Sequence, residues 1–257
     1  MNFWGKVIII TGASSGIGKE LALSLSKEKC KLVLIARRIE FINELKEEIE
    51  KNGSELFTIK CDVTDKIQVK YSVDSVLNKF NQIDGAILNS GVSVKQSFAN
   101  FDSYVAEQTF AVNYFGIVNY LNELLPVFKK QRSGFIAGVS SLADARGFPV
   151  SGIYCSSKAA VTTLLESLKA EYKPFNVKII NIHPGFVKTP MTDKNDFTMP
   201  FLMDVKKACK IIMKGFRKDK NIIKFPWQMT LLTGIIKRIP DSWFQYIADK
   251  RVSIKKL

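Results

Sequence analysis

Short apolar runs alternate with longer amphipathic stretches along most of the chain. The runs have strand length and consist largely of Val, Ile, Leu, Phe and Ala: 6–11, 31–36, 55–60, 84–89, 134–140, 176–182 and 222–225. Continuous apolar strands that alternate with amphipathic helices are typical of a parallel sheet covered on both faces. We therefore expect an α/β Rossmann fold: a doubly wound parallel sheet of about seven strands in a single domain, 1–257.

The stretches between these runs carry apolar residues at helical spacing. We expect helices over 19–29, 41–53, 66–80, 102–130, from near Tyr154 to about 172, and over 204–216. In the second of these, Phe41, Leu45 and Ile49 fall four residues apart, and Gly53 stands where that helix should end. Pro174 lies just beyond the expected end of the helix that carries Tyr154.

Composition narrows the class of protein. The chain has 257 residues, 46% of them hydrophobic, and no apolar run approaches the roughly 20 residues of a membrane-spanning helix. Its N-terminus lacks the features of a signal peptide, so we expect a cytoplasmic protein. The four cysteines are widely separated and the chain has one histidine, His183, so we expect buried cysteines, no disulfide framework and no metal site.

A net charge of +14 raises the question of a nucleic-acid partner. Lys and Arg are spread along the chain, however, and no basic stripe interleaved with aromatic residues or other nucleic-acid motif is present. We therefore expect a solvated basic surface and no nucleic-acid partner.

A glycine-rich turn, TGASSGIG, follows the first expected strand and precedes the first expected helix. In a Rossmann fold this position meets a dinucleotide pyrophosphate, which the free N–H groups and the dipole of the helix attract. The expected cofactor contacts in the turn are Gly12, Ser14, Ser15, Gly16, Ile17 and Gly18. About twenty residues on, a NAD site would show an acidic residue, but the chain has Arg37 and Arg38. Guanidinium groups pair with a 2′-phosphate, so the predicted cofactor is NADP(H).

Tyr154 precedes Lys158 by four residues in SGIYCSSKAAV. Positions four apart share one face of a helix, so the phenol and the ammonium can face one space. A nearby cation favours the phenolate and lowers the phenol pKa, which would suit Tyr154 to proton exchange with a substrate oxygen. Taken alone, such a pair more often indicates an amphipathic tyrosine at a helix start and a solvated lysine.

With this turn, this pair and this order of strands, the sequence resembles the short-chain dehydrogenase/reductase family over about residues 5–225. The resemblance implies a catalytic set of Asn113, Ser141, Tyr154 and Lys158. It further implies cofactor contacts at Asp62, Val63, Asn89, Gly91, Tyr154, Lys158, Pro184, Gly185, Val187 and Thr189. One motif departs from the family: Leu88-Asn89-Ser90-Gly91 replaces the usual Asn-Asn-Ala-Gly, so the hydrogen bonds around this turn are expected to differ.

The resemblance implies an NADP(H)-dependent oxidoreductase that interconverts a carbonyl and an alcohol by hydride transfer. Tyr154 would act as general acid and base, Ser141 would orient the substrate oxygen, Lys158 would hold the nicotinamide ribose, and Asn113 would position a water. Apolar residues after the sixth strand favour an apolar, lipid-like ketone or oxoacyl substrate, although they could equally anchor their loop to the core: Phe186, Met191, Phe197, Met199 and Phe201. A reductase of small hydroxy or oxo acids and a non-catalytic NADPH-binding sensor remain alternatives.

The segment 226–257 combines apolar and aromatic residues with clustered Lys and Arg. From 220 to 257 the chain has eight Lys or Arg and two Asp. Such a basic amphipathic extension can contact a second subunit or lie peripherally on an anionic membrane. Because the family commonly forms homodimers or homotetramers, we expect the subunit contact.

Overall fold

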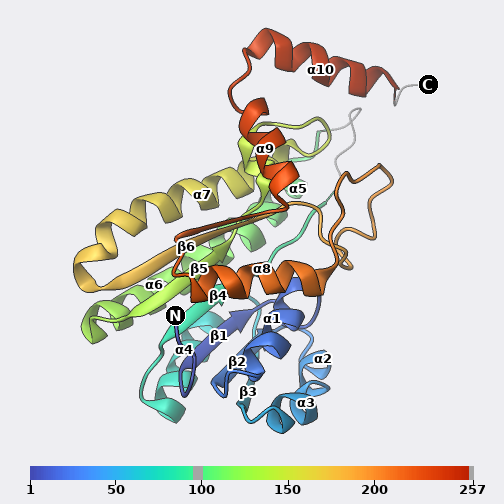
Figure 1. Cartoon of the computed structure of the whole chain (residues 1–257). Coiled ribbons are helices and arrows are strands. Elements are labelled where there is room, and N and C mark those ends of the chain that lie inside the picture. The colour runs from blue at the N-terminus through green and yellow to red at the C-terminus, as the bar shows by residue number, and fades with distance from the viewer. Residues whose placement is uncertain (95–100, 255–257) are drawn as a thin grey trace.

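The computed structural model describes residues 1–94 and 101–254 of the chain. This part contains a sheet of seven parallel strands in the order β3-β2-β1-β4-β5-β6-β7 (Figure 1). The strands are β1 (Val7–Thr11), β2 (Lys31–Ala36), β3 (Glu55–Lys60), β4 (Gly85–Leu88), β5 (Gly134–Val139), β6 (Val177–Pro184) and β7 (Ile222–Phe225). The predicted α/β, doubly wound Rossmann fold is confirmed, and each strand begins and ends close to its expected bounds.

Helices cover both faces of the sheet (Figure 1). One face packs against α1 (Gly16–Ser26), α2 (Glu40–Asn43), α3 (Lys46–Lys51) and α8 (Val205–Arg217), and the other against α4 (Lys66–Phe80), α6 (Gly116–Gln131) and α7 (Gly152–Tyr172). In β1, Ile8 and Ile10 belong to the first core, whereas Val7 and Ile9 belong to the second. Both sides of the strand are buried, which explains its unbroken apolar sequence.

Two predicted helices are wrong in detail. The stretch 41–53 forms two short helices, α2 and α3, and buries Ile42, Leu45 and Ile49, while Phe41 is 39% exposed. The stretch 102–130 comprises α5 (Ser103–Phe110), a π-helical turn η1 (Ala111–Phe115) and α6. A π turn adds one residue to one turn of the helix, and this changes the apolar pattern too little for the turn to be predicted from the sequence. Such turns are frequent at functional sites.

The C-terminal segment forms two helices, α9 (Trp227–Ile236) and α10 (Asp241–Ile254), which extend away from the sheet in Figure 1. A salt bridge of 2.9 Å between Arg146 Nη1 and Asp241 Oδ1 fastens the start of α10 to the loop before α7. Among the helices in the described ranges, none combines the length and apolar character needed to cross a bilayer.

The predicted site residues gather at the carboxyl edge of the sheet. The glycine turn follows β1, Asn89 follows β4, Ser141 follows β5 by way of Ser140, and Pro184 ends β6. Two short 3₁₀ helices, η2 (Leu142–Ala145) and η3 (Lys173–Phe175), lie before and after α7. In open α/β sheets this edge is where ligands bind.

Candidate active site

The turn between β1 and α1 is built for close approach of a ligand to the backbone. Gly12 and Gly16 have φ of +65° and +56°, the left-handed region that favours glycine. A Cβ on Gly18 would lie 2.4 Å from the Gly12 carbonyl oxygen. The N-cap residue, Ser15, makes no side-chain capping hydrogen bond, so the first N–H groups of α1 remain available to an anion. The turn fits a dinucleotide pyrophosphate.

The two arginines after β2 have different neighbours. Arg38 Nη2 donates a hydrogen bond of 3.2 Å to Ser14 Oγ, and its guanidinium lies 5.1 Å from the centroid of the Phe41 ring. Arg37 Nη1 lies 3.6 Å from Asp62 Oδ2; the arginine side chain is largely exposed and the aspartate side chain about one-third exposed. Arg38 therefore borders the glycine turn itself, whereas Arg37 points towards the end of β3.

Asp62 and Val63 follow β3. The Asp62 carboxylate accepts hydrogen bonds of 3.0 and 2.9 Å from the backbone N–H and the hydroxyl of Thr64. Val63 is 7% exposed, and its carbonyl oxygen accepts a hydrogen bond of 2.9 Å from Asn119 Nδ2 on α6. These contacts fix the turn that borders the Arg37 side of the site.

The departure from the family motif at Asn89-Ser90-Gly91 leaves the turn after β4 well connected. Asn89 Nδ2 donates to the carbonyl oxygens of Thr11 and Gly12 at 3.2 and 3.3 Å. Thr11 Oγ1 accepts from the backbone N–H groups of Asn89 and Ser90 at 3.0 and 3.2 Å. Asn89 and Thr11 thus tie β4 to the glycine turn across the gap between β1 and β4. Thr11 begins the TGASSGIG turn, but its contacts with Asn89 and Ser90 depend on the strand order and could not be predicted from the sequence.

The loop after β6 passes over the glycine turn. Gly185 N donates a hydrogen bond of 2.7 Å to the Phe225 carbonyl oxygen, and the buried Val187 pairs with Met203 in an isolated bridge. Thr189 Cγ2 is so close to Gly16 that a Cβ added there would lie 3.1 Å from it. The structure therefore places the predicted residues after β6 opposite those after β1.

Three members of the predicted catalytic set lie around the end of β5. Ser141 is the N-cap of η2, and its hydroxyl accepts from Ala143 N at 3.1 Å. Tyr154 and Lys158 lie in the first two turns of α7, with Lys158 Nζ 5.9 Å from the centroid of the Tyr154 ring. Lys158 is 3% exposed, and its ammonium donates a hydrogen bond of 2.9 Å to the Val139 carbonyl oxygen.

The fourth member, Asn113, lies on the π turn η1 and is fully buried. Its Oδ1 accepts from Val92 N at 2.8 Å, and its Nδ2 donates to the Val92 carbonyl oxygen and to Ser157 Oγ, each at 3.0 Å. A Cβ on Gly91 would lie 3.4 Å from Asn113 Oδ1 and 3.5 Å from Lys158 Nζ. Asn113 Oδ1 and Lys158 Nζ therefore both lie beside Gly91.

The comparisons with known proteins agree with this geometry. Residues 6–199 match the family model described as short chain dehydrogenase. The chain belongs to the short-chain dehydrogenase/reductase family. An uncharacterized oxidoreductase from Myxococcus xanthus is 30% identical to this short-chain dehydrogenase/reductase over 245 residues, which cover 95% of this chain and 97% of the relative.

Two solved structures have a similar fold. A short-chain dehydrogenase/reductase from Burkholderia phymatum in complex with NAD has a TM-score of 0.83 at 21% identity, covering 91% of this chain and 93% of that one. An alcohol dehydrogenase from the archaeon Thermococcus sibiricus, complexed with 5-hydroxy-NADP, has a TM-score of 0.77 at 25% identity, covering 86% and 94%. Because these two proteins hold different nucleotides, the likeness leaves the choice between NAD and NADP open.

Burial governs the pKa values at the centre of this short-chain dehydrogenase/reductase. It raises the pKa of Tyr154 to about 12, although hydrogen bonding with Ser141 acts in the opposite direction. Burial also lowers the pKa of Lys158 to about 8. The expectation that Lys158 lowers the Tyr154 pKa is therefore wrong for this structure. The ammonium is directed at the Val139 carbonyl oxygen, and desolvation of the phenol outweighs any attraction between the two groups.

The apolar residues of the loop after β6 are mostly at the surface of the short-chain dehydrogenase/reductase. The Phe186 and Phe197 rings pack edge to face with centroids 5.8 Å apart, and Met191, Phe197 and Phe201 are 37%, 40% and 47% exposed. Each of these three side chains is therefore partly exposed to solvent and partly covered by the protein. A cavity of about 250 Å³ lies at the end of the loop, lined by Phe201, Leu202, Met203, Asp204, Lys207, Pro226 and Gln228.

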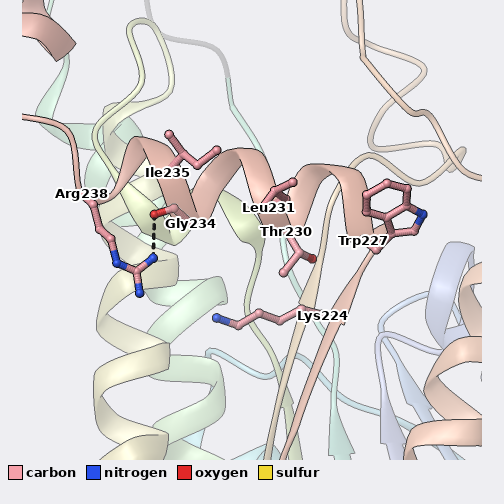
Figure 2. A pocket seen from close by; sticks show the side chains of 7 residues that line it. All are labelled: Lys224, Trp227, Thr230, Leu231, Gly234, Ile235 and Arg238. Carbon is pink, nitrogen blue, oxygen red and sulfur yellow. Dashed lines mark hydrogen bonds between the residues drawn. The ribbon is translucent and has the colours of Figure 1, made fainter.

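A second cavity, of about 410 Å³, lies beside α9 and is lined by Lys224, Trp227, Thr230, Leu231, Gly234, Ile235 and Arg238. Figure 2 shows the Lys224 side chain extending under α9 towards Arg238, whose guanidinium donates a hydrogen bond of 3.0 Å to the Gly234 carbonyl oxygen. None of the four predicted catalytic residues lines this cavity. It belongs to the C-terminal helices of the short-chain dehydrogenase/reductase and not to its candidate active site.

Proposed function

We propose that the protein is an NADP(H)-dependent oxidoreductase that interconverts a carbonyl and an alcohol, with Tyr154 as general acid and base. The observation that carries this proposal is the juxtaposition of Tyr154, Lys158 and Ser141 at the end of β5, facing the edge of the sheet that holds the glycine turn. The membership in a family of oxidoreductases supports the reaction class.

A nicotinamide dinucleotide fits the residues present and supplies or accepts the hydride when it is bound. The glycine turn and the uncapped start of α1 would hold its pyrophosphate, because the cradle admits no Cβ at Gly18 and presents free N–H groups. Lys158 would contact the nicotinamide ribose, and Thr189 lies where the loop after β6 covers the turn.

The protein's own groups would handle the proton. With a pKa near 12, the Tyr154 phenol is protonated at neutral pH and can donate to a carbonyl oxygen during reduction. Ser141 would hydrogen-bond the same oxygen and orient it. Asn113, held rigidly by Val92 and Ser157, would position a water beside Lys158. Reduction of a carbonyl is the direction for which the phenol already carries the needed proton.

The preference for NADP(H) rests on the arginines after β2. Arg38 reaches Ser14 of the glycine turn, so its charge lies at the edge of the site where a ribose 2′-phosphate would be bound. The sequence Ala36-Arg37-Arg38 has no carboxylate there that would repel the phosphate. The exposed apolar side chains of the loop after β6 favour an apolar carbonyl substrate over small oxo acids.

The experiment that tests this proposal is NADPH oxidation, followed by absorbance, with a panel of apolar ketones, oxoacyl esters and small oxo acids. We expect turnover of the apolar compounds, a lower Kd for NADPH than for NADH, and a loss of about 100-fold or more in kcat for Tyr154→Phe with NADPH affinity retained. Tyr172→Phe, at the far end of α7, is the matched control. Near wild-type turnover by Tyr154→Phe would refute the role of Tyr154, and NADPH binding without any turnover would favour a sensor.

We further propose that the exposed apolar side chains of α9 and α10 bury themselves against a second copy of the chain. Four of them are Trp227, Leu231, Ile235 and Trp243, each more than half exposed. Large apolar side chains exposed together are typical of surfaces that contact another protein or a membrane. Peripheral contact with an anionic membrane is the alternative for the same residues.

A further inference from the structure

The single histidine of the chain is buried against a carboxylate directly behind the candidate active site. His183 Nδ1 lies 2.9 Å from Asp144 Oδ2, and the two side chains are 4% and 13% exposed. The same carboxylate oxygen accepts a hydrogen bond of 2.5 Å from Thr162 Oγ1. Asp144 lies on η2, His183 on β6 and Thr162 on α7, so this cluster joins three elements at one oxygen.

Each of these elements carries a member of the candidate site. Ser141 begins η2, three residues before Asp144, and its hydroxyl donates to the Pro184 carbonyl oxygen at 3.4 Å. Pro184 directly follows His183 and begins the segment expected to cover the nicotinamide. The Asp144 to His183 contact therefore joins the same two segments as the contact between Ser141 and Pro184. Together the two contacts fix the distance between the backbone of η2 and the backbone at the end of β6.

The third element is connected through Ser140. Its Oγ lies 2.8 Å from the Lys158 carbonyl oxygen and 2.8 Å from Thr162 Oγ1, and it can donate to one of them at a time. Lys158 and Thr162 are four positions apart and therefore lie on one face of α7, the helix that also carries Tyr154. A series of contacts thus leads from the Lys158 backbone through Ser140 and Thr162 to Asp144. The position of Tyr154 relative to Ser141 depends on this series.

Because Asp144 is charged and buried, the fold is sensitive to the loss of either of its partners. Burial raises the pKa of the Asp144 carboxyl, but the close approach of His183 and the hydrogen bond from Thr162 outweigh burial and hold the pKa below its ordinary value. Lys224 of β7, which pairs with His183 in the sheet, also lowers it. A buried carboxylate that loses one of its partners is strongly destabilised, so the pair resists displacement of either element.

We propose that Asp144 and His183 are positioning residues, which hold Ser141 and the Pro184-Gly185 segment in register with Tyr154 so that the substrate oxygen meets both hydroxyls. The proposal rests on the proposed function, because Ser141 and Tyr154 act on a carbonyl only if that function is right. Neither residue touches the reacting atoms. Their removal lowers kcat through misalignment, while the glycine turn, which would bind the pyrophosphate, is left intact and keeps most of the nucleotide affinity.

The pairing itself can be tested without turnover, because His183 is the only histidine. In ¹⁵N-histidine-labelled protein, nitrogen chemical shifts report which ring nitrogen carries a proton. Because Nδ1 lies beside the Asp144 carboxylate, we expect the neutral ring to carry its proton on Nδ1. We expect Asp144→Asn to move the neutral ring towards the Nε2–H form. A neutral His183 protonated only at Nε2 in the wild type would overturn the pair.

The positioning role is tested by kinetics on the substrate found in the panel. We expect Asp144→Asn and His183→Leu to lower kcat about tenfold or more, with KM for the carbonyl and Kd for NADPH within about twofold of wild type. His183→Asn places a donor near the Nδ1 position and should recover most of kcat. Asp241→Asn removes a carboxylate that pairs with Arg146 nearby, but outside the cluster, and is the matched control.

The outcomes separate this proposal from the proposed function. Unchanged kcat in both Asp144→Asn and His183→Leu, or equal losses for His183→Leu and His183→Asn, would overturn the positioning role. If Asp144→Asn does not fold, Thr162→Val interrupts the cluster without changing its charge and should lower kcat in the same way. Absence of turnover by the wild type with any carbonyl would instead refute the proposed function, while the tautomer of His183 would still decide whether the pair forms.

Discussion

At the residue scale, Lys158 shows that a residue of the candidate site lowers the stability of the folded protein. The ammonium is buried and makes one hydrogen bond, to the Val139 carbonyl oxygen, and burial lowers its pKa from 10.5 to about 8. A pKa that falls this far on folding corresponds to roughly 3 kcal/mol of destabilisation when the lysine is charged. The folded protein therefore holds a cation where a neutral side chain would be more stable.

We predict that Lys158→Met increases the free energy of unfolding at pH 7 by roughly 1 to 2 kcal/mol while abolishing turnover. The gain is smaller than the full charge penalty because the hydrogen bond to Val139 is lost. Between about pH 8 and 10.5 the unfolded chain keeps the Lys158 proton that the folded protein has released, so wild-type stability rises with pH and the advantage of the variant disappears. Urea unfolding at several pH values measures both effects, and a variant less stable than wild type at pH 7 would contradict the prediction.

The positions of Tyr154, Lys158, Ser141 and Asn113 could be predicted from the sequence because motif spacing and family resemblance locate residue types in the chain. The pKa values of these residues could not be predicted in this way. The pKa of Tyr154 depends on its burial, and the spacing of a tyrosine and a lysine along the chain says nothing about burial. Asp144 and His183 were missed for a related reason. They lie thirty-nine positions apart on elements whose contact exists only once β5 and β6 pair.

At the element scale, the β1–turn–α1 unit depends on backbone clearances of a few ångströms. Gly18 packs against the carbonyl oxygen of Gly12, a neighbour that cannot rotate away as a flexible side chain could. The strand and the helix are therefore locked at the distance that presents the N–H groups of α1 to the site.

We predict that Gly18→Ala raises the Kd for NADPH at least about tenfold and destabilises the fold by about 1 to 3 kcal/mol, because the new Cβ would lie 2.4 Å from Gly12 O. Nucleotide fluorescence titration and urea unfolding measure the two effects. Gly147→Ala is the control, since a Cβ there meets nothing within 4 Å. Equal behaviour of the two variants would mean that the close approach does not hold the turn.

The strands could be predicted because each is a short, mainly apolar run between longer amphipathic stretches. The helices were harder. The chain from 102 to 130 has one helical pattern, but η1 widens it where Asn113 must reach both Val92 and Ser157. Those tertiary contacts, absent from any local window, decide the form of the helix.

At the scale of the whole molecule, α9 and α10 are the part whose structure could least be predicted from the sequence. Their basic and aromatic composition was evident, but not their helices, because their buried residues are few and follow no helical repeat; in α9 only Thr233 is buried. Two helices that contact the body mainly through η2, β7 and Arg146 leave much of their apolar surface in water.

We predict that Leu231→Ser together with Ile235→Ser shifts the molecular mass measured by light scattering from an oligomer towards the monomer. Burial of one such side chain contributes about 1.5 kcal/mol or more, so each substitution should weaken association at least about tenfold. Ile67→Ser, on the exposed start of α4, is the control and should leave the mass unchanged. A monomeric wild type that co-sediments with anionic vesicles would support the membrane alternative instead.

The strand order also bears on how the chain is made. β1 pairs with β2 on one side and with β4 on the other, yet β2 and β3 are synthesised long before β4. At about 5 to 20 residues per second, the ribosome needs roughly 1 to 5 seconds to deliver the segment between β3 and β4. During that interval the nascent chain can form β1, β2 and β3, but one edge of β1, flanked by apolar side chains on both faces, has no strand to pair with. The arrival of β4 brings Asn89 onto Thr11 and Gly12, and so the glycine turn is completed in the same step that closes this edge.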